Sequence, residues 1–222
     1  MTGRRTITTD HIRACLAGTR PPDDPTCIAP ATGRSDWRRQ LVEKAGTELR
    51  AAAVLMPIVE RHTGLSVLLT ERAAELRHHP GQISFPGGRM EASDADLRHT
   101  ALRETEEEVG ILAHQVDIAG YLDVLPTITG YAVTPVVGLV VPDITLRIDA
   151  SEVAQVFEVP LEFLMDESNQ QHSVRRFQGI DLPLVEYRYG PHRIWEQRAA
   201  MLTILKDIHQ IKERYEWYPE IT

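Results

Sequence analysis

Four glutamates crowd the end of one predicted helix. Glu104, Glu106, Glu107 and Glu108 lie within five positions, shortly before Gly110. Glu104 and Glu108 are four residues apart, so their side chains project from the same helical face, with Glu107 beside them. Like charges at this spacing repel one another, and negative charge near a helix C-terminus also opposes the helix dipole. A divalent cation would reverse that penalty, since carboxylate oxygens are ligands that Mg²⁺ and Mn²⁺ prefer.

The alternative is a solvated acidic helix face, which is the usual meaning of an isolated group of like charges. The flanking residues favour a metal site over a solvated face. The pair Gly87-Gly88 lies upstream, and Ser93 is the predicted N-cap, with Asp96 as its capping partner. Gly110 is predicted to end the helix. The predicted inner face consists of Leu97, Ala101, Leu102, Thr105 and Val109. A tight loop therefore leads into a short helix that carries the acids.

Residues 88–110 resemble the Nudix box, which consists of a glycine, a spacer, Arg-Glu, a variable pair, Glu-Glu, a variable residue and a final glycine. Here the Arg-Glu pair is Arg103-Glu104, and the Glu-Glu pair is Glu107-Glu108. The step from Gly88 to Arg103 is fifteen positions, one more than in the general box. The longer spacer is similar to that of the coenzyme A pyrophosphatase branch of the family.

A second motif resembles the same branch. Residues 68–73 read Leu-Leu-Thr-Glu-Arg-Ala, Arg77 follows, and residues 81–88 read Gly-Gln-Ile-Ser-Phe-Pro-Gly-Gly. This motif runs directly into the box, so the two together cover residues 68–111.

The resemblance implies an α/β fold, the Nudix-type α/β/α sandwich with a mixed sheet. It also implies an enzyme that uses Mg²⁺ or Mn²⁺ to hydrolyse the pyrophosphate bond of coenzyme A or its derivatives, giving 3′,5′-ADP and (acyl-)4′-phosphopantetheine. One alternative is a Nudix hydrolase of another nucleotide, such as ADP-ribose or a nucleoside triphosphate. A non-catalytic nucleotide-binding regulator is another, but it should have lost box carboxylates, and none is lost here.

The resemblance assigns roles to the box residues. Glu104 and Glu108 are expected to be the primary metal ligands, with Glu107 as a further ligand or as the base for the attacking water. Cations are needed because a diphosphate is strongly negative and repels a nucleophile. Arg103 is expected to pair with a box carboxylate and fix its rotamer.

Further residues complete the expected site. Gly87 or Gly88 is expected to supply a backbone carbonyl to the metal, again by resemblance. Arg72 and Arg77 are expected to hold the anionic groups of the substrate through charge-assisted hydrogen bonds. Glu152 is the candidate for a remote acid, and a solvated loop glutamate is the alternative.

Composition narrows the class of protein. The chain has 222 residues and a net charge of −8, which suits one domain and disfavours a protein that coats nucleic acid. Cys15 and Cys27 do not have a paired spacing and are expected to be thiols of a reducing compartment. No apolar run approaches transmembrane length, so the expected location is the cytoplasm, with no membrane partner. The expected partner is a small nucleotide substrate, and a homodimer is left open.

The pattern of apolar residues predicts one domain at residues 36–222, preceded by a helix and arm at residues 1–35. Helices are expected at residues 10–18, 36–51, 161–165 and 196–217. Strands are expected at residues 52–59, 66–70, 116–125 and 133–141, with a hairpin at residues 174–189, and residues 151–159 lead into the helix at 161–165. Strands grouped around the acidic helix favour a mixed sheet covered on both faces.

Overall fold

The computed structural model describes residues 7–26, 40, 43, 49–76, 80–195 and 200–206. Within them, eight strands form a mixed sheet, sheet A, and three form a smaller antiparallel sheet, sheet B. The strands of sheet A are β1 (Arg50–Arg61), β2 (Gly64–Arg72), β3 (Ile83–Ser84), β4 (Gly87–Arg89), β5 (Val116–Tyr121), β6 (Leu125–Pro126), β7 (Tyr131–Val140) and β8 (Val153–Pro160). Sheet B contains β9 (Gln170–Phe177), β10 (Ile180–Tyr189) and β11 (His192–Trp195).

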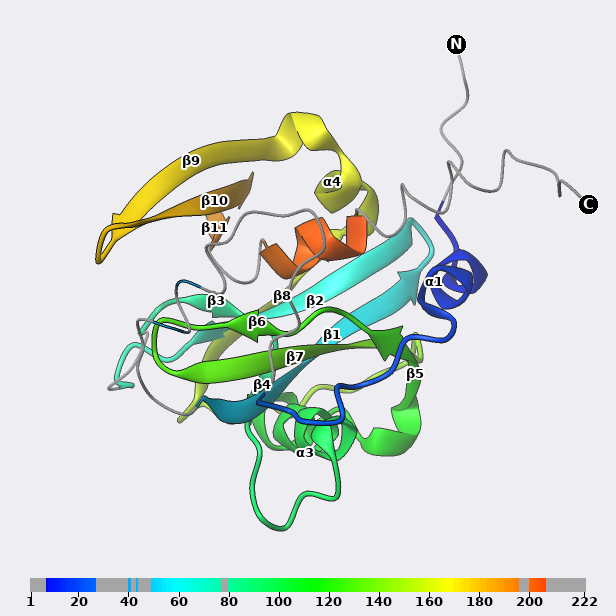
Figure 1. The fold of residues 1–222 in the computed structure, drawn as a ribbon. Helices are drawn as coiled ribbons and strands as arrows, with labels where there is room; N and C mark the ends of the chain where they lie inside the picture. Colours follow the sequence, from blue (N-terminus) through cyan, green and yellow to red (C-terminus); the bar gives the residue numbers. More distant parts are fainter. Residues whose placement is uncertain are drawn as a thin grey trace, which may run out of the picture.

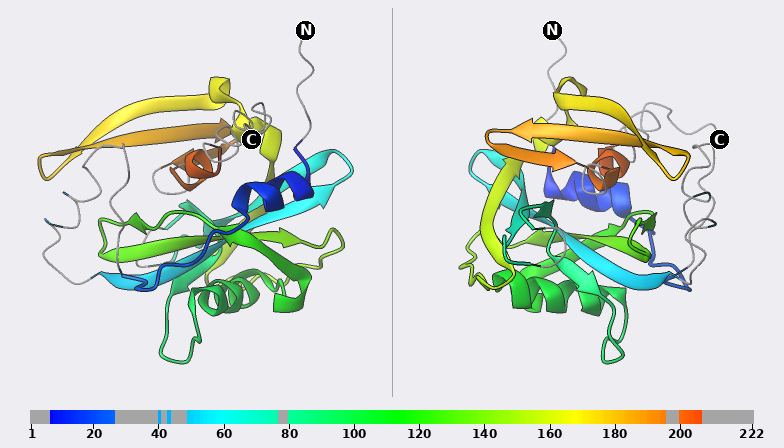
Figure 2. Two further views of the ribbon diagram at one scale, coloured as in Figure 1. Left: turned by 45° about the vertical axis from the view of Figure 1, so that its right-hand side comes forward. Right: turned by 90° about the vertical axis from the view of Figure 1, so that its left-hand side faces the viewer.

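The helices cover both faces of sheet A (Figure 1). They are α1 (Thr9–Leu16), α3 (Leu97–Val109) and α4 (Leu161–Met165), with 3-10 turns at Ala113–Gln115 and Glu167–Asn169 and a helical stretch at residues 200–206. In both views of Figure 2, α3 lies below the sheet, while α1, the helical stretch and sheet B lie above it. The α/β/α class with a mixed sheet is confirmed.

Two hydrophobic cores follow from this layering. The upper core joins sheet A to α1, α4, sheet B and residues 200–206, through side chains such as Leu16, Leu161, Tyr187 and Leu202. The lower core packs the inner face of α3 against the other face of the sheet. Near-continuous apolar runs form the two central strands, β1 and β7, which pair in parallel and are covered on both sides.

The β1–β2 hairpin opens at one end, and this opening positions the glycine loop. The two strands pair only from Ile58↔Val67 to Arg61↔Gly64. Beyond that point, β3 pairs with the end of β2 and β4 pairs with the start of β1. Residues 83–89 are therefore wedged between β1 and β2, and Leu55 N donates to Pro86 O across the gap at 2.9 Å.

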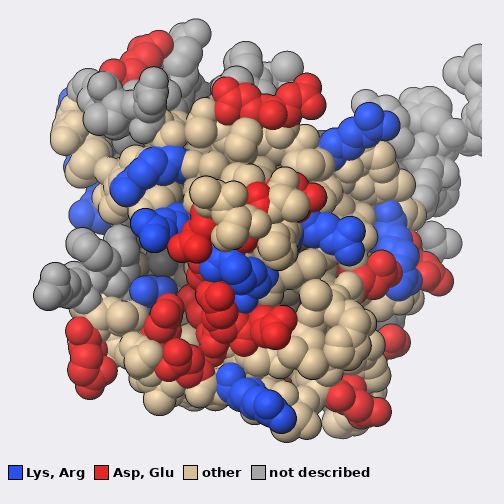
Figure 3. Space-filling view, turned by 90° about the horizontal axis from the view of Figure 1, so that it is seen from below, with Lys and Arg blue, Asp and Glu red and all other residues tan. Residues whose placement is uncertain are grey.

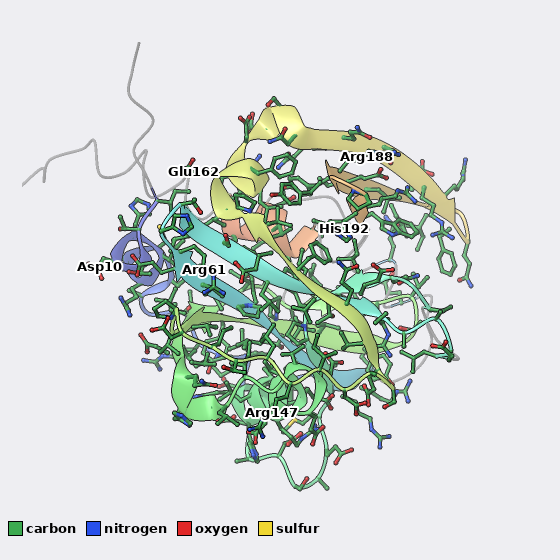
Figure 4. All side chains as sticks on the ribbon, turned by 180° about the vertical axis from the view of Figure 1, so that it is seen from behind. Asp10, Arg61, Arg147, Glu162, Arg188 and His192 are labelled. Atoms are coloured by element: carbon green, nitrogen blue, oxygen red, sulfur yellow. The ribbon has the colours of Figure 1, made fainter. Side chains whose placement is uncertain are left out.

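Sheet B rests on sheet A partly through an aromatic contact. The His192 ring stacks on Phe157 of β8, with ring centroids 3.7 Å apart and planes 6° apart. Figure 4 shows His192 on the side of sheet B that faces sheet A. No helix in the described part of the chain is long and apolar enough to span a membrane.

Most predicted elements are present, with differences at several boundaries. Helix α1 spans Thr9–Leu16 where 10–18 was predicted, and the strand predicted over 116–125 is divided into β5 and β6. Residues 50 and 51 belong to β1 and not to the helix predicted over 36–51, of which only residues 40 and 43 are described as helical. Of the helix predicted over 196–217, residues 200–206 are helical, and the rest lies outside the described residues. The N-cap of α3 is Asp96 and not Ser93, and Asp96 accepts a hydrogen bond from His99 N at 2.7 Å.

Candidate functional site

Helix α3 presents its acidic turn to the glycine loop. The helix ends at Gly110, whose φ of 76° is left-handed and whose N–H donates to Glu106 O. The inner face packs against sheet A, and this packing fixes the rotation of the helix about its axis. Helix α3 contacts both β1 and β4, and Glu104 and Glu108 lie beside the glycine pair of β4.

The two glycines contact these two carboxylates. Gly87 N donates to Glu108 Oε2 at 3.3 Å. A Cβ placed on Gly88 would lie 2.5 Å from the Glu104 carboxyl atoms, so only glycine leaves room for that side chain. Glu104 and Glu108 thus flank the glycine pair, and the backbone of the loop borders the same space.

Glu108 is the most buried of the glutamates on this turn. Its side chain is 4% exposed, and the nearest cation is Arg72, with Nη1 3.8 Å from Glu108 Oε1. The pKa of Glu108 is raised to about 8, mainly by burial, with Glu104 and Glu152 adding to the rise and Arg72 opposing it. Burial also raises the pKa of Glu104. A group of part-buried carboxylates with too little positive charge fits a divalent cation, which would favour the ionised forms of the glutamates.

Arg103 organises the acids around it. Its Nη1 donates to Glu104 Oε1 at 2.8 Å and to Glu107 Oε2 at 3.1 Å. Its Nη2 donates to the backbone oxygen of Arg89 at 3.2 Å. The guanidinium therefore ties the helix to the loop that follows β4 and sets the direction of the Glu104 carboxylate.

Asp94 is a site residue that the sequence analysis missed. Its side chain is fully buried and accepts from Arg103 Nε at 2.9 Å and from Arg103 Nη2 at 3.0 Å. It also accepts from Thr100 Oγ1 and from Glu91 N. The hydrogen bonds from Arg103 hold the pKa of Asp94 well below its usual range, and the same pair raises the pKa of Arg103. In the sequence, Asp94 is only one acid in the spacer between Gly88 and Arg103. It precedes the helix, so the helical period does not relate its position to that of Arg103.

The segment before Glu152 caps the end of α3. Arg147 N donates to Val109 O at 2.9 Å, and Asp149 N donates to Glu108 O at 3.0 Å, which satisfies two of the terminal helix carbonyls. Figure 4 shows Arg147 beside α3. Glu152 follows directly, and its side chain is exposed. It is close enough to Glu104 and Glu108 to influence both of their pKa values.

The second motif reaches the site through β2 and β3. Arg72, at the end of β2, lies beside Glu108, and Ala73 N donates to Glu152 O at 2.8 Å. The pairing of β2 with β8 shifts register between Glu71 and Arg72, which is a common irregularity near functional sites. Arg77 lies outside the described residues.

The acids are not arranged as a closed metal cluster. Among the described residues, no three His, Cys, Asp or Glu side chains form a group that could hold an ion without adjustment. Arg103 holds Glu107 on its own side, and the Glu107 side chain is 59% exposed. Seen from below, acidic side chains gather in the middle of this face, with basic groups among them (Figure 3). The candidate ligands Glu104, Glu107 and Glu108 lie within the last turn and a half of α3.

Comparison with known proteins identifies the family. The model of the NUDIX domain matches residues 49–177. A relative from Enterobacter sp. (strain 638), named as an uncharacterized Nudix hydrolase, NudL, is 42% identical over 146 residues, which are 66% of this chain and 70% of the relative. A protein of the same name from Escherichia coli O1:K1 / APEC is 45% identical over 148 residues, with the same coverage of 66% and 70%.

Among solved structures, the crystal structure of a C. elegans Ap4A hydrolase binary complex aligns with a TM-score of 0.47 at 15% identity, covering 75% of this chain and 99% of that chain. The domain match and the two bacterial relatives show the family by sequence. The chain belongs to the Nudix hydrolases, a family of pyrophosphohydrolases that generally use divalent metal ions such as Mg²⁺ or Mn²⁺.

Proposed function

We propose that this Nudix hydrolase cuts the pyrophosphate bond of coenzyme A or its acyl derivatives. The observation that carries the proposal is that the second motif, residues 68–88, borders the acidic turn. Arg72 of that motif lies 3.8 Å from Glu108, and Gly87 and Gly88 contact Glu108 and Glu104. The motif and the lengthened spacer are the two features in which the chain resembles the coenzyme A branch, and both contribute to one site.

Glu104 and Glu108 are the proposed metal ligands, with Glu107 as a third. A bound divalent cation would neutralise the diphosphate and lower the pKa of the attacking water. Hydrogen bonds within the chain position these groups. Asp94 holds Arg103, and Arg103 holds the carboxylates of Glu104 and Glu107.

Arg72 is proposed to bind the diphosphate of the substrate. Its side chain is 24% exposed, and its Nη1 lies 3.8 Å from Glu108 Oε1, which is longer than a hydrogen bond. A guanidinium carries five N–H donors, so it can also bind phosphate oxygens. Arg77 is proposed to bind the substrate in the same way, because it belongs to the same motif as Arg72. Glu152 is exposed at the rim and is proposed as the acid that either joins the metal site or accepts a proton from water.

A side-by-side activity screen tests the proposal. Purified protein is given coenzyme A, an acyl derivative, ADP-ribose and nucleoside triphosphates, each with Mg²⁺ and with Mn²⁺. We expect the highest kcat/KM with a coenzyme A species. Hydrolysis in isotopically labelled water should place the label in 3′,5′-ADP. Faster hydrolysis of ADP-ribose than of every coenzyme A species would overturn the substrate assignment and leave the family assignment standing.

A further inference from the structure

An open groove lies at the end of β4, directly after the glycine pair. Its volume is about 700 Å³, and it is lined by the start of β1, at Arg50 and Ala51, and by residues 89–93. Ligand pockets for small molecules commonly fall between about 300 and 1,000 Å³, so the groove is large enough for a nucleoside with its phosphates. No residue of the groove belongs to the catalytic set described above.

Two arginines give the groove its chemistry. The Arg50 guanidinium carbon lies 4.2 Å from the centroid of the Tyr131 ring, so its face is held while its N–H edges are left for a ligand. The Arg89 side chain is 68% exposed, and its Nη2 lies 3.4 Å from Glu91 Oε1. Glu91 offsets one of the two positive charges, and the remaining one favours an anion. Ala51 and Met90 form an apolar part of the wall of the groove.

The groove is built into the same framework as the catalytic residues. The backbone oxygen of Arg89 accepts from Arg103, and Glu91 N donates to Asp94, which itself holds Arg103. One buried carboxylate therefore positions both the wall of the groove and the arginine that orients Glu104. A ligand in the groove would be held in a defined relation to the acidic turn.

The spacing along β1 matches a nucleotide that spans both places. Gly88, which touches Glu104, pairs with Ala53 of β1. Arg50 lies three residues earlier on the same strand, about 10 Å away at the usual rise of a strand, and this odd spacing directs its side chain to the opposite face of the sheet from Gly88 and Glu104. Arg89 follows Gly88 on β4, so its side chain shares the face of Arg50. A diphosphate held at the acidic turn would therefore reach both arginines with its nucleoside passing over the end of β4.

We propose that this groove binds the 3′-phosphorylated adenosine end of the substrate, with Arg50 and Arg89 on the 3′-phosphate. The proposal rests on the proposed function, because coenzyme A is a substrate that carries such a phosphate. It separates two roles. Arg72 acts at the diphosphate that is cut, and Arg50 and Arg89 select the nucleotide that bears the extra phosphate.

Equilibrium binding tests the groove without turnover. The full-length protein is titrated by calorimetry with 3′,5′-ADP and with 5′-AMP, as wild type and as Arg50→Gln and Arg89→Gln. The wild type should bind 3′,5′-ADP at least about tenfold more tightly than 5′-AMP, since a charge-assisted pair adds more than 1.4 kcal/mol. Each variant should lose most of that preference. Arg175→Gln removes an exposed arginine of β9, in the other sheet, and should keep it.

Kinetics provide the second arm. Arg50→Gln and Arg89→Gln should raise KM for coenzyme A about tenfold and leave KM for dephospho-coenzyme A and both kcat values near those of the wild type. A wild type with no preference for 3′,5′-ADP, or variants that keep it, would overturn the groove assignment. A third outcome is that the wild type prefers 3′,5′-ADP and the variants lose that preference, while coenzyme A is not hydrolysed. That result would support the groove assignment and reject coenzyme A as the substrate.

Discussion

At the scale of single residues, the site depends on how Glu108 is surrounded. A carboxylate that is 4% exposed and lies near Glu104 and Glu152 is costly to ionise, and Arg72 at 3.8 Å compensates only partly. A cation placed among these oxygens removes the repulsion and supplies the charge that a diphosphate requires. The same residues that would bind the metal are therefore a source of instability without it.

Replacing Glu104 or Glu108 with Gln tests this statement. Each change removes one carboxylate ligand, so kcat/KM should fall by about 10²-fold or more, as expected when metal stabilisation of the transition state is lost. Thermal stability without metal should hold or rise, because a neutral amide is less costly than a carboxyl group to bury beside the remaining acids. Calorimetric melting with and without Mg²⁺, together with turnover at saturating Mg²⁺, measures both effects.

Glu106→Gln is the matched control, since Glu106 lies on the same turn but is exposed. It should keep wild-type turnover and wild-type response to Mg²⁺. Near-full activity of both Glu104→Gln and Glu108→Gln at saturating metal would show that the ligands lie elsewhere.

Arg72→Ala tests the proposed hold on the substrate. KM should rise about tenfold or more through loss of a charge-assisted hydrogen bond, while kcat changes less, because binding is weakened in the ground state and the transition state alike. Steady-state kinetics with coenzyme A measure the two constants separately. Arg98→Ala, an exposed arginine on α3, serves as the control. An unaltered KM for Arg72→Ala would move recognition away from β2.

At the scale of elements, the decisive feature is the loop wedged into the open β1–β2 hairpin. Residues 83–89 fill the gap with β3 and β4, and the glycine pair reaches the underside of the sheet where α3 packs. The loop has little freedom there. Gly87 has a φ of 153°, and a Cβ on it would lie 2.4 Å from the backbone oxygen of Ala53.

The two glycines should therefore respond differently to alanine. Gly88→Ala places a methyl group against the Glu104 carboxylate, a flexible side-chain end, so activity should fall at least about tenfold with little change in unfolding free energy. Gly87→Ala meets the backbone of β1 and is strained, so it should lower the unfolding free energy by about 1–3 kcal/mol. Urea unfolding and kinetics of both variants provide the comparison. Equal losses of stability would contradict this reading of the loop.

The pair between Asp94 and Arg103 predicts a dependence on pH. Because the folded-state pKa of Asp94 is depressed, its contribution to stability is present above the unfolded pKa and is lost as pH falls through the folded value. Asp94→Asn should cost about 2 kcal/mol of unfolding free energy at pH 7, the scale of lost hydrogen bonds to a charged group. The difference from the wild type should narrow below about pH 4. A pH-independent difference in urea unfolding from pH 7 to pH 3 would refute the assignment.

At the scale of the whole molecule, the upper hydrophobic core joins α1 to sheet A and sheet B. Leu16 of α1 is 1% exposed and belongs to the same core as sheet A, α4 and sheet B. Thr19 Oγ1 accepts from Tyr121 N at 2.9 Å, and Arg13 pairs with Asp117 of β5 at 2.9 Å. The domain division near residue 35 stays a prediction, while α1 packs as part of the body of sheet A.

Leu16→Ala should therefore destabilise the whole protein and leave the chemistry intact. A buried leucine replaced by alanine costs about 3 kcal/mol, and the site lies on the opposite face of the sheet. We expect a lower midpoint in urea with kcat and KM unchanged at a temperature where the variant is folded. Asp23→Asn, an exposed change in the loop that follows α1, is the control, because it leaves the helix propensity of α1 unchanged. A variant with wild-type stability would mean that α1 is not part of the cooperative unit.

The sequence by itself determined the family, the acidic turn, most strands and the end of α3. Those features are local: Glu104, Glu107 and Glu108 share a face because of helical period, and Gly110 ends the helix because of its own backbone freedom. Pairs that lie outside the helical period were decided only by the tertiary structure. Asp94 turns inward to Arg103, so the loop continues to Asp96 before the helix begins, and Ser93 does not cap it.

The depth of Glu108, its approach to Arg72 and the groove between Arg50 and Arg89 likewise exist only because β4 enters the opened hairpin beside β1. Local propensity describes each of these segments separately, but burial and electrostatics arise from the packing of segments that are far apart in sequence.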